Sequence, residues 1–190
     1  MGKTKTMKAE IKKHSDWEDG FLFLGNQLAL DFLNTRPVQN DKPVELLADF
    51  SALLRWFQAA SVLSLRDAAN LQTRWEKSPR AQRMVEALRG LRERLRKEIF
   101  GWEHRGTVHR ATIDELNRLM AEHPMRTRLK PNGRTPSTEL YFEPRQPEDL
   151  FAPLAHSAAS LFADVDRERV RKCDRCVLHF HDTSKRGTRR

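Results

Sequence analysis

The chain has 190 residues, the length of one ordinary domain with at most a small appended module. Charged residues make up 32% of it, and the net charge is +9 with arginine in excess of lysine. This balance favours polyanionic partners, because the arginine fork binds phosphate through two N–H groups, although a merely basic, soluble protein stays an alternative. No apolar run approaches the ~18 residues that span a membrane, and no secretory signal follows the basic start. We therefore expect a cytoplasmic protein with no membrane partner.

The first third of the chain predicts a short strand followed by helices. Phe21 to Leu24 form an apolar run that ends at Gly25, which is typical of a buried strand entering a turn. Apolar residues at helical spacing then predict a short helix before Pro37. Further amphipathic stripes and start signals predict helices over about 44–60, 64–75, 79–105 and 112–122, the longest stopped by Gly106.

The second half adds extended segments. Pro131-Asn132-Gly133 separates two alternating segments, so residues 125–143 predict a β-hairpin whose basic and acidic residues pair across the strands. A last helix is expected from Gln146-Pro147 to about Val165, and a strand before Cys173. The predicted fold is α+β: five or six helices around one core, with a small antiparallel sheet from the hairpin, the Phe21 strand and the strand before Cys173.

Cys173 and Cys176 are the only cysteines, spaced as C-x-x-C. Two thiolates at this spacing can reach one tetrahedral Zn²⁺, but a closed structural site needs four ligands. His179 and His181 are possible substitute ligands, and a zinc ion shared between two chains is another closure. A redox pair and simple free thiols are the remaining alternatives.

Two stretches resemble one bacterial family. The first is Gly25-Asn-Gln-Leu-Ala-Leu-Asp31-Phe-Leu-Asn34-Thr35, and the second is Cys173-x-x-Cys176 with Phe180, Asp182, Ser184 and Arg189-Arg190. Together they are similar to proteins with an N-terminal ABATE domain and a C-terminal CGNR-type zinc finger, described as stress-induced transcription regulators. The resemblance implies an ABATE-like domain over 1–168 and a zinc finger over 169–190. The family's Trp-Cys-Ser-Met and Cys-Gly-Asn-Arg are absent here, so we expect a finger truncated after its first cysteine pair, and zinc as the cofactor of the complete finger.

Basic residues surround the cysteines and form the candidate contact to DNA: Arg171, Lys172, Lys185, Arg186, Arg189 and Arg190. A solvated, frayed tail is the alternative. The function that the resemblance implies is a DNA-binding transcription regulator, in which the N-terminal domain senses a signal or mediates assembly.

Three polar residues of the first stretch form a candidate ligand site: Asp31, Asn34 and Arg36. Either they pair with the backbone around the turn, or they anchor a small-molecule effector between aromatic walls. The sequence contains no nucleophile motif and no glycine-rich phosphate loop, so we do not expect an enzyme. The alternative function is a ligand-binding or homodimerisation module without DNA binding of its own.

Overall fold

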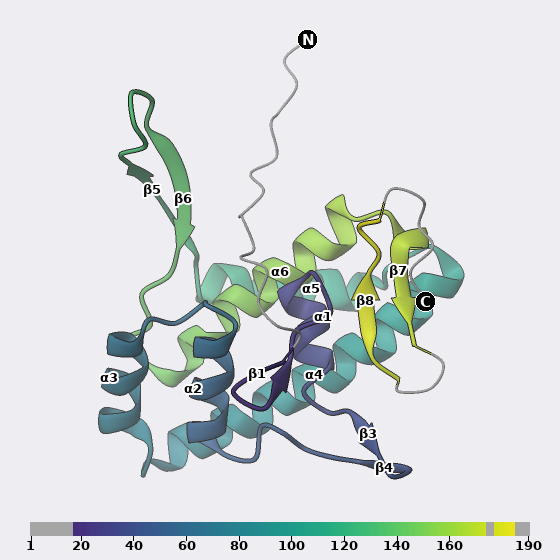
Figure 1. Cartoon of the computed structure of the whole chain (residues 1–190), viewed down its shortest axis with the longest axis horizontal. Coiled ribbons are helices and arrows are strands. Elements are labelled where there is room, and N and C mark those ends of the chain that lie inside the picture. Colours follow the sequence, from purple (N-terminus) through teal and green to yellow (C-terminus); the bar gives the residue numbers. More distant parts are fainter. Residues whose placement is uncertain (1–16, 174–176, 185–190) are drawn as a thin grey trace.

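The computed structural model describes residues 17–173 and 177–184. The fold is α+β and mainly helical, as predicted (Figure 1). The helices are α1 (Leu28–Leu33), α2 (Phe50–Ala59), α3 (Leu65–Trp75), α4 (Pro79–Arg105), α5 (Arg110–Glu122) and α6 (Phe151–Asp164), with single 3₁₀ turns η1 (Pro147–Leu150) and η2 (Arg167–Arg169). The antiparallel ribbons are β1 (Trp17–Glu18) with β2 (Phe21–Leu22), β3 (Val38–Gln39) with β4 (Lys42–Pro43), β5 (Arg126–Lys130) with β6 (Ser137–Tyr141), and β7 (Val170–Lys172) with β8 (His179–His181).

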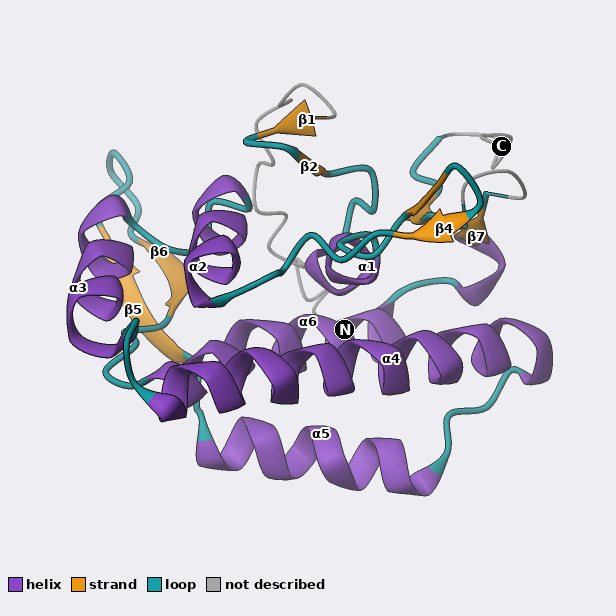
Figure 2. Ribbon diagram, turned by 90° about the horizontal axis from the view of Figure 1, so that it is seen from below, coloured by secondary structure: helices purple, strands orange, loops and turns teal. Residues whose placement is uncertain are grey.

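Helix α4 is the central element, and its bounds follow from local signals. The Ser78 hydroxyl accepts from the Ala81 N–H at 3.2 Å, and Pro79 occupies the first turn, where its missing N–H costs nothing. At the other end Gly106 has a φ of +76°, the left-handed conformation that glycine adopts readily. In Figure 2, α4 lies between α5 on one side and α1 on the other.

Helix α1 is short and buried on nearly every side. Ala29, Leu30, Phe32 and Leu33 are each 0% exposed, since α1 packs against α4 and α6 and under the terminal ribbon. The Phe32 ring lies 5.6 Å from the ring of Trp56 in α2. Phe32 and Trp56 are therefore part of the core.

Several predicted elements are corrected. The helix expected over 44–60 begins only at Phe50, because the Asp49 carboxylate accepts from the Ala52 N–H and caps it there. Thr112 does not cap α5; its hydroxyl donates to Glu98 at 3.0 Å. The strands do not form one sheet but separate two-stranded ribbons within the described residues. The predicted hairpin, the strand before Cys173 and the pairing of Arg128 and Lys130 with Glu139 are confirmed.

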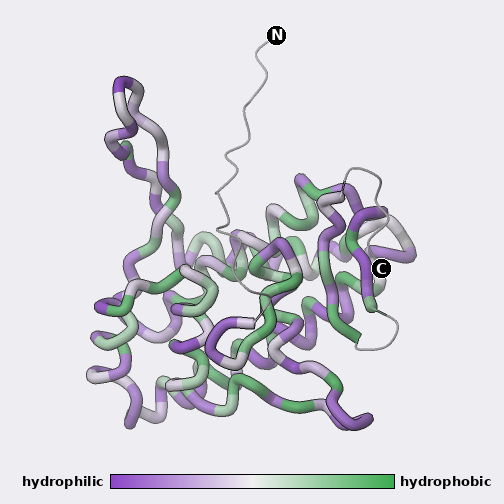
Figure 3. Tube along the Cα trace, viewed as in Figure 1, coloured by the Kyte–Doolittle hydropathy of each residue, from purple (hydrophilic) through white to green (hydrophobic). Residues whose placement is uncertain are grey.

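The surface is most hydrophilic at the tips of the ribbons. Figure 3 shows this for the β3–β4 turn and for the far end of the β5–β6 hairpin. Among the helices of the described residues, none combines the length and the apolar character that crossing a bilayer requires.

Candidate nucleic-acid interface

The first contact of the site joins Gly25 to Asp31. The Asp31 carboxylate is 8% exposed, and its Oδ1 accepts from the Gly25 N–H at 2.6 Å. A Cβ at Gly25 would lie 2.8 Å from the Asp31 nitrogen, from its Oδ1 and from the Leu30 Cβ, so only glycine fits. Burial raises the pKa of Asp31 to about 7, against the opposite effect of the hydrogen bonds from the Gly25 and Leu24 backbone.

Asn34 joins α1 to the C-terminal ribbon. Its Nδ2 donates to the His179 carbonyl at 2.9 Å, and its Oδ1 accepts from the His179 N–H at 2.8 Å. The side chain thus pairs with β8 as a neighbouring strand does. Asn26 donates to the His181 carbonyl at 2.9 Å, and the His181 N–H donates to the Gly25 carbonyl at 2.8 Å. Gly25, Asn26 and Asn34 therefore fix the β7–β8 ribbon to α1 and to the turn before α1.

Helix α4 supports α1 from the opposite side. The Thr35 hydroxyl donates to the Phe32 carbonyl at 2.7 Å and accepts from Arg92 at 2.8 Å. Arg92 is 1% exposed and pairs with Glu45, which keeps its buried charge compensated. Arg36 forms an ion pair with Glu93 at 3.4 Å.

Asp31, Asn34 and Arg36 therefore make separate contacts: to Gly25, to β8 and to Glu93. None of the three lines either of the two cavities described below. A ligand site at these residues stays a prediction.

The β7–β8 ribbon carries the cysteine motif. Val170, Leu178 and Phe180 are buried, and Val170 belongs to the main core. Directly after β7, the Cys173 N–H donates to the Leu178 carbonyl at 2.8 Å, and the Cys173 carbonyl accepts from the Val177 N–H at 3.1 Å. The division into domains at residue 168 stays a prediction, but the described part of the second segment packs against α1.

The ligands for zinc are only partly described. Cys173 is half-buried, while Cys176 lies outside the described residues. Among the residues that the structure places, no three or more His, Cys, Asp or Glu side chains gather as a metal site. The Cys173 thiolate can supply one ligand of a zinc site, whereas a closed structural site needs four.

His179 is 2% exposed, and its ring lies next to the Val177 backbone. Burial lowers its pKa to about 4, helped by the charges of Arg96 and Lys172 and opposed by the Val177 carbonyl. The ring is therefore neutral at neutral pH. His181 has a lowered pKa for the same first reason, burial.

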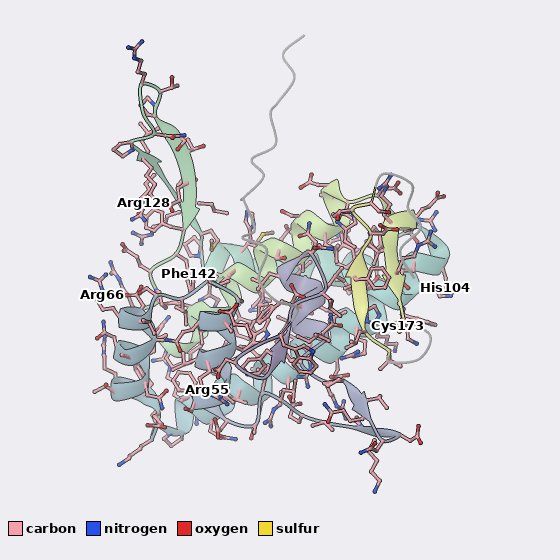
Figure 4. All side chains as sticks on the ribbon, viewed as in Figure 1. Arg55, Arg66, His104, Arg128, Phe142 and Cys173 are labelled. Carbon is pink, nitrogen blue, oxygen red and sulfur yellow. The ribbon has the colours of Figure 1, made fainter. Side chains whose placement is uncertain are left out.

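An open cavity of about 430 Å³ lies beside the β7–β8 ribbon, between the end of α4, η2 and β7. It is lined by Glu103, His104, Arg167, Glu168, Val170, Arg171 and Lys172. Arg171 and Lys172 are exposed, and Lys172 Nζ lies 5.7 Å from the centre of the Phe100 ring. Arg167 donates to the Glu103 carbonyl at 2.8 Å, where the last turn of α4 leaves carbonyls unpaired. His104 and Cys173 lie at the same end of the molecule (Figure 4).

Two of the predicted nucleic-acid contacts, Arg171 and Lys172, thus come together with Arg167 and His104, which the sequence reading missed. Arg167 belongs to η2 and His104 to α4. The only sequence signal near them is Gly106, which indicates the end of α4 but not what packs against it. The other predicted contacts, Lys185, Arg186, Arg189 and Arg190, lie outside the described residues. Burial raises the pKa of Glu103 to about 7, while His104, Lys172 and Arg171 act in the opposite direction.

The fold and this surface define a class: a mainly helical α+β protein with a basic C-terminal ribbon. The model of the ABATE family, described as "Putative stress-induced transcription regulator", matches residues 26–165. The chain therefore belongs to the ABATE family, and the resemblance seen in the first stretch is confirmed. The match begins at Asn26 and ends before the β7–β8 ribbon. A search among curated proteins found no match.

Proposed function

We propose that the chain is a DNA-binding transcription regulator whose β7–β8 ribbon contacts the phosphate backbone, while the helical domain senses a signal or mediates assembly. The observation that carries the proposal is the cavity of about 430 Å³, whose lining includes the three cations Arg167, Arg171 and Lys172. Backbone recognition needs several cations in fixed register, and phosphate contacts supply most of the salt-dependent affinity. The hydrogen bonds of Asn34 hold β8, and through it β7, in one position on the domain.

The net charge of +9 supports the same partner, because long-range attraction to a polyanion accelerates encounter. The family description, a transcription regulator, agrees with it. The basic residues that follow residue 184 would extend the same contact along the duplex.

The test is the salt dependence of duplex DNA binding, measured by fluorescence anisotropy with the full chain. Arg171→Ala/Lys172→Ala removes two exposed cations of β7. If each neutralises a phosphate, the slope of log K against log salt falls by about 0.9 per contact, or about 2 in all. The matched control is Arg74→Ala/Lys77→Ala, which removes equal charge from the end of α3 and the loop after it. A slope that the control changes as much as the β7 variant would contradict the proposal.

Zinc is part of the proposal as a structural group held by the Cys173 and Cys176 thiolates together with the two further ligands that a closed site needs, supplied by a second copy of the chain. Zinc bound in this way would stabilise the β7–β8 ribbon, because structural zinc adds directly to folding free energy. Metal analysis of the purified chain, against Cys173→Ser/Cys176→Ser, tests it. Equal zinc content in the two proteins would overturn this assignment.

A further inference from the structure

The β5–β6 ribbon, together with its turn, is called the arm here (residues 125–145). It projects from the body beside α3 (Figure 1). All residues of β5 are exposed, and the paired strands of five residues extend about 16 Å. A two-stranded ribbon is at best marginally stable when it stands alone in water, so an arm held out in solvent calls for an explanation.

The charged residues of the arm are mainly basic. Residues 125–145 contain five basic and two acidic residues, and the basic ones are Arg126, Arg128, Lys130, Arg134 and Arg145. Arg126, Arg128 and Lys130 alternate along β5 and so share one face. Glu139 on β6 pairs with both Arg128, at 2.8 Å, and Lys130, at 3.0 Å. The Arg128 guanidinium also lies 4.5 Å from the centre of the Tyr141 ring, and this cation–π contact holds it in place.

The other face of the arm carries threonine and leucine side chains. The register places Thr127 opposite Leu140 and Leu129 opposite Thr138. Leu129 is 73% exposed and Leu140 is 38% exposed. Threonine hydroxyls bind phosphates and base edges, and apolar side chains contact the thymine methyl group.

The groove at the base of the arm joins it to the body. A cavity of about 760 Å³ lies between the arm, the start of α3 and α6, lined by residues that include Arg66, Arg128, Arg145 and His156. Phe142, at the foot of β6, packs against the main core and anchors the arm. The same cavity is also lined by Asp67, Glu139 and Glu143, which balance these arginines, so the basic character lies on the arm itself and not in the groove. The arm thus has a fixed base and a free length.

From these observations we propose that the arm is a second DNA contact, which enters a groove of the duplex while the β7–β8 ribbon binds the backbone elsewhere. A two-stranded ribbon fits the major groove of B-DNA, which is about 12 Å wide. A second copy of the chain fits less well as the occupant, because two arms of equal positive charge repel each other and the whole chain carries +9. This inference rests on the proposed function, since both require duplex DNA.

The test uses the full chain and Arg126→Ala/Arg134→Ala, which spares the Glu139 pairs. The expected result is a salt slope lower by about 2, at about 0.9 per phosphate contact, with an unchanged circular dichroism melting curve. The control is again Arg74→Ala/Lys77→Ala. Its positions lie at the end of α3 remote from the groove, which touches only the start of that helix; α3 is about 16 Å long.

Each outcome separates the two proposals. A lower slope in the arm variant alone supports the arm contact. Equal slopes for the arm variant and its control overturn the arm contact, and the proposed function survives if Arg171→Ala/Lys172→Ala still lowers the slope. Wild-type protein without salt-dependent DNA binding overturns both. Loss of self-association in the arm variant, seen by sedimentation with DNA binding unchanged, identifies a second copy as the occupant and overturns the arm contact.

Discussion

Replacing Asn34 by alanine removes both hydrogen bonds between α1 and the backbone of His179. The His179 N–H and carbonyl then lie buried without their partner, because the residue is 2% exposed. An unsatisfied buried group costs about 1–3 kcal/mol, so the two together destabilise the docked ribbon by about 2–6 kcal/mol. This is a large share of the roughly 5–15 kcal/mol that stabilises an ordinary domain.

Hydrogen exchange provides the assay, since it reports stability segment by segment. In Asn34→Ala we expect faster exchange of the β7 and β8 amides, whereas the amides of α4 change less. Asn70→Ala, on the exposed surface of α3, is the matched control and should leave both sets unchanged. Wild-type protection of β8 in Asn34→Ala would refute the conclusion that this side chain holds the ribbon.

Three further predictions concern the same region. Gly25→Ala should destabilise by about 1–3 kcal/mol in thermal melts, because its Cβ would meet the Asp31 side chain and Leu30 at 2.8 Å, while the helical Gly90→Ala should not. The folded state keeps a proton on Asp31 that the unfolded chain releases between pH 3.8 and about 7, so this carboxyl lowers stability as pH rises through that window. Asp31→Asn should therefore gain about 3 kcal/mol relative to wild type from pH 4 to 7 in urea titrations; a constant difference would be contrary to this. Glu103 has a pKa of about 7 and ionises beside Arg171 and Lys172, so the DNA affinity of the wild type should fall as the pH rises from about 6 to 8. In Glu103→Gln this fall should be smaller, and the same pH profile in both proteins would count against the prediction.

Local signals predicted those elements that carry their own boundaries. Ser78-Pro79 and Gly106 define α4, and the Pro131-Asn132-Gly133 turn defines the arm. The prediction of a helix over 44–60 was wrong at its start, because Leu46 and Leu47 continue the helical spacing although their segment is not helical, and Leu47 is buried. Spacing alone does not distinguish a buried loop residue from a helical one.

The strand at Phe21 was predicted, but its partner β1 and the whole β3–β4 ribbon were missed, because two-residue strands have no periodicity. Their turns did leave a signal: Asp19-Gly20 and Asn40-Asp41 all have positive φ, the conformation of tight hairpin turns. Asp-Gly and Asn-Asp at these positions could have indicated both ribbons.

The candidate site was predictable only in part. Asp31 and Asn34 stood out as polar residues beside apolar ones, and the idea that they pair with backbone was one of two interpretations. The partner of Asn34 lies 145 positions away, so no local pattern reveals it. Likewise, Arg171 and Lys172 were visible as basic residues, but their approach to Arg167 and His104 depends on how β7 lies against the end of α4.

We propose that Asn34, at the end of α1, holds the basic β7–β8 ribbon in position for DNA. The most direct measurement is the affinity of Asn34→Ala for duplex DNA, since this variant changes no charge. We predict weaker binding and a lower salt slope than wild type, because freed cations no longer lie in register with the phosphates. Wild-type affinity and slope, in a variant whose β8 amides exchange freely, would contradict the claim.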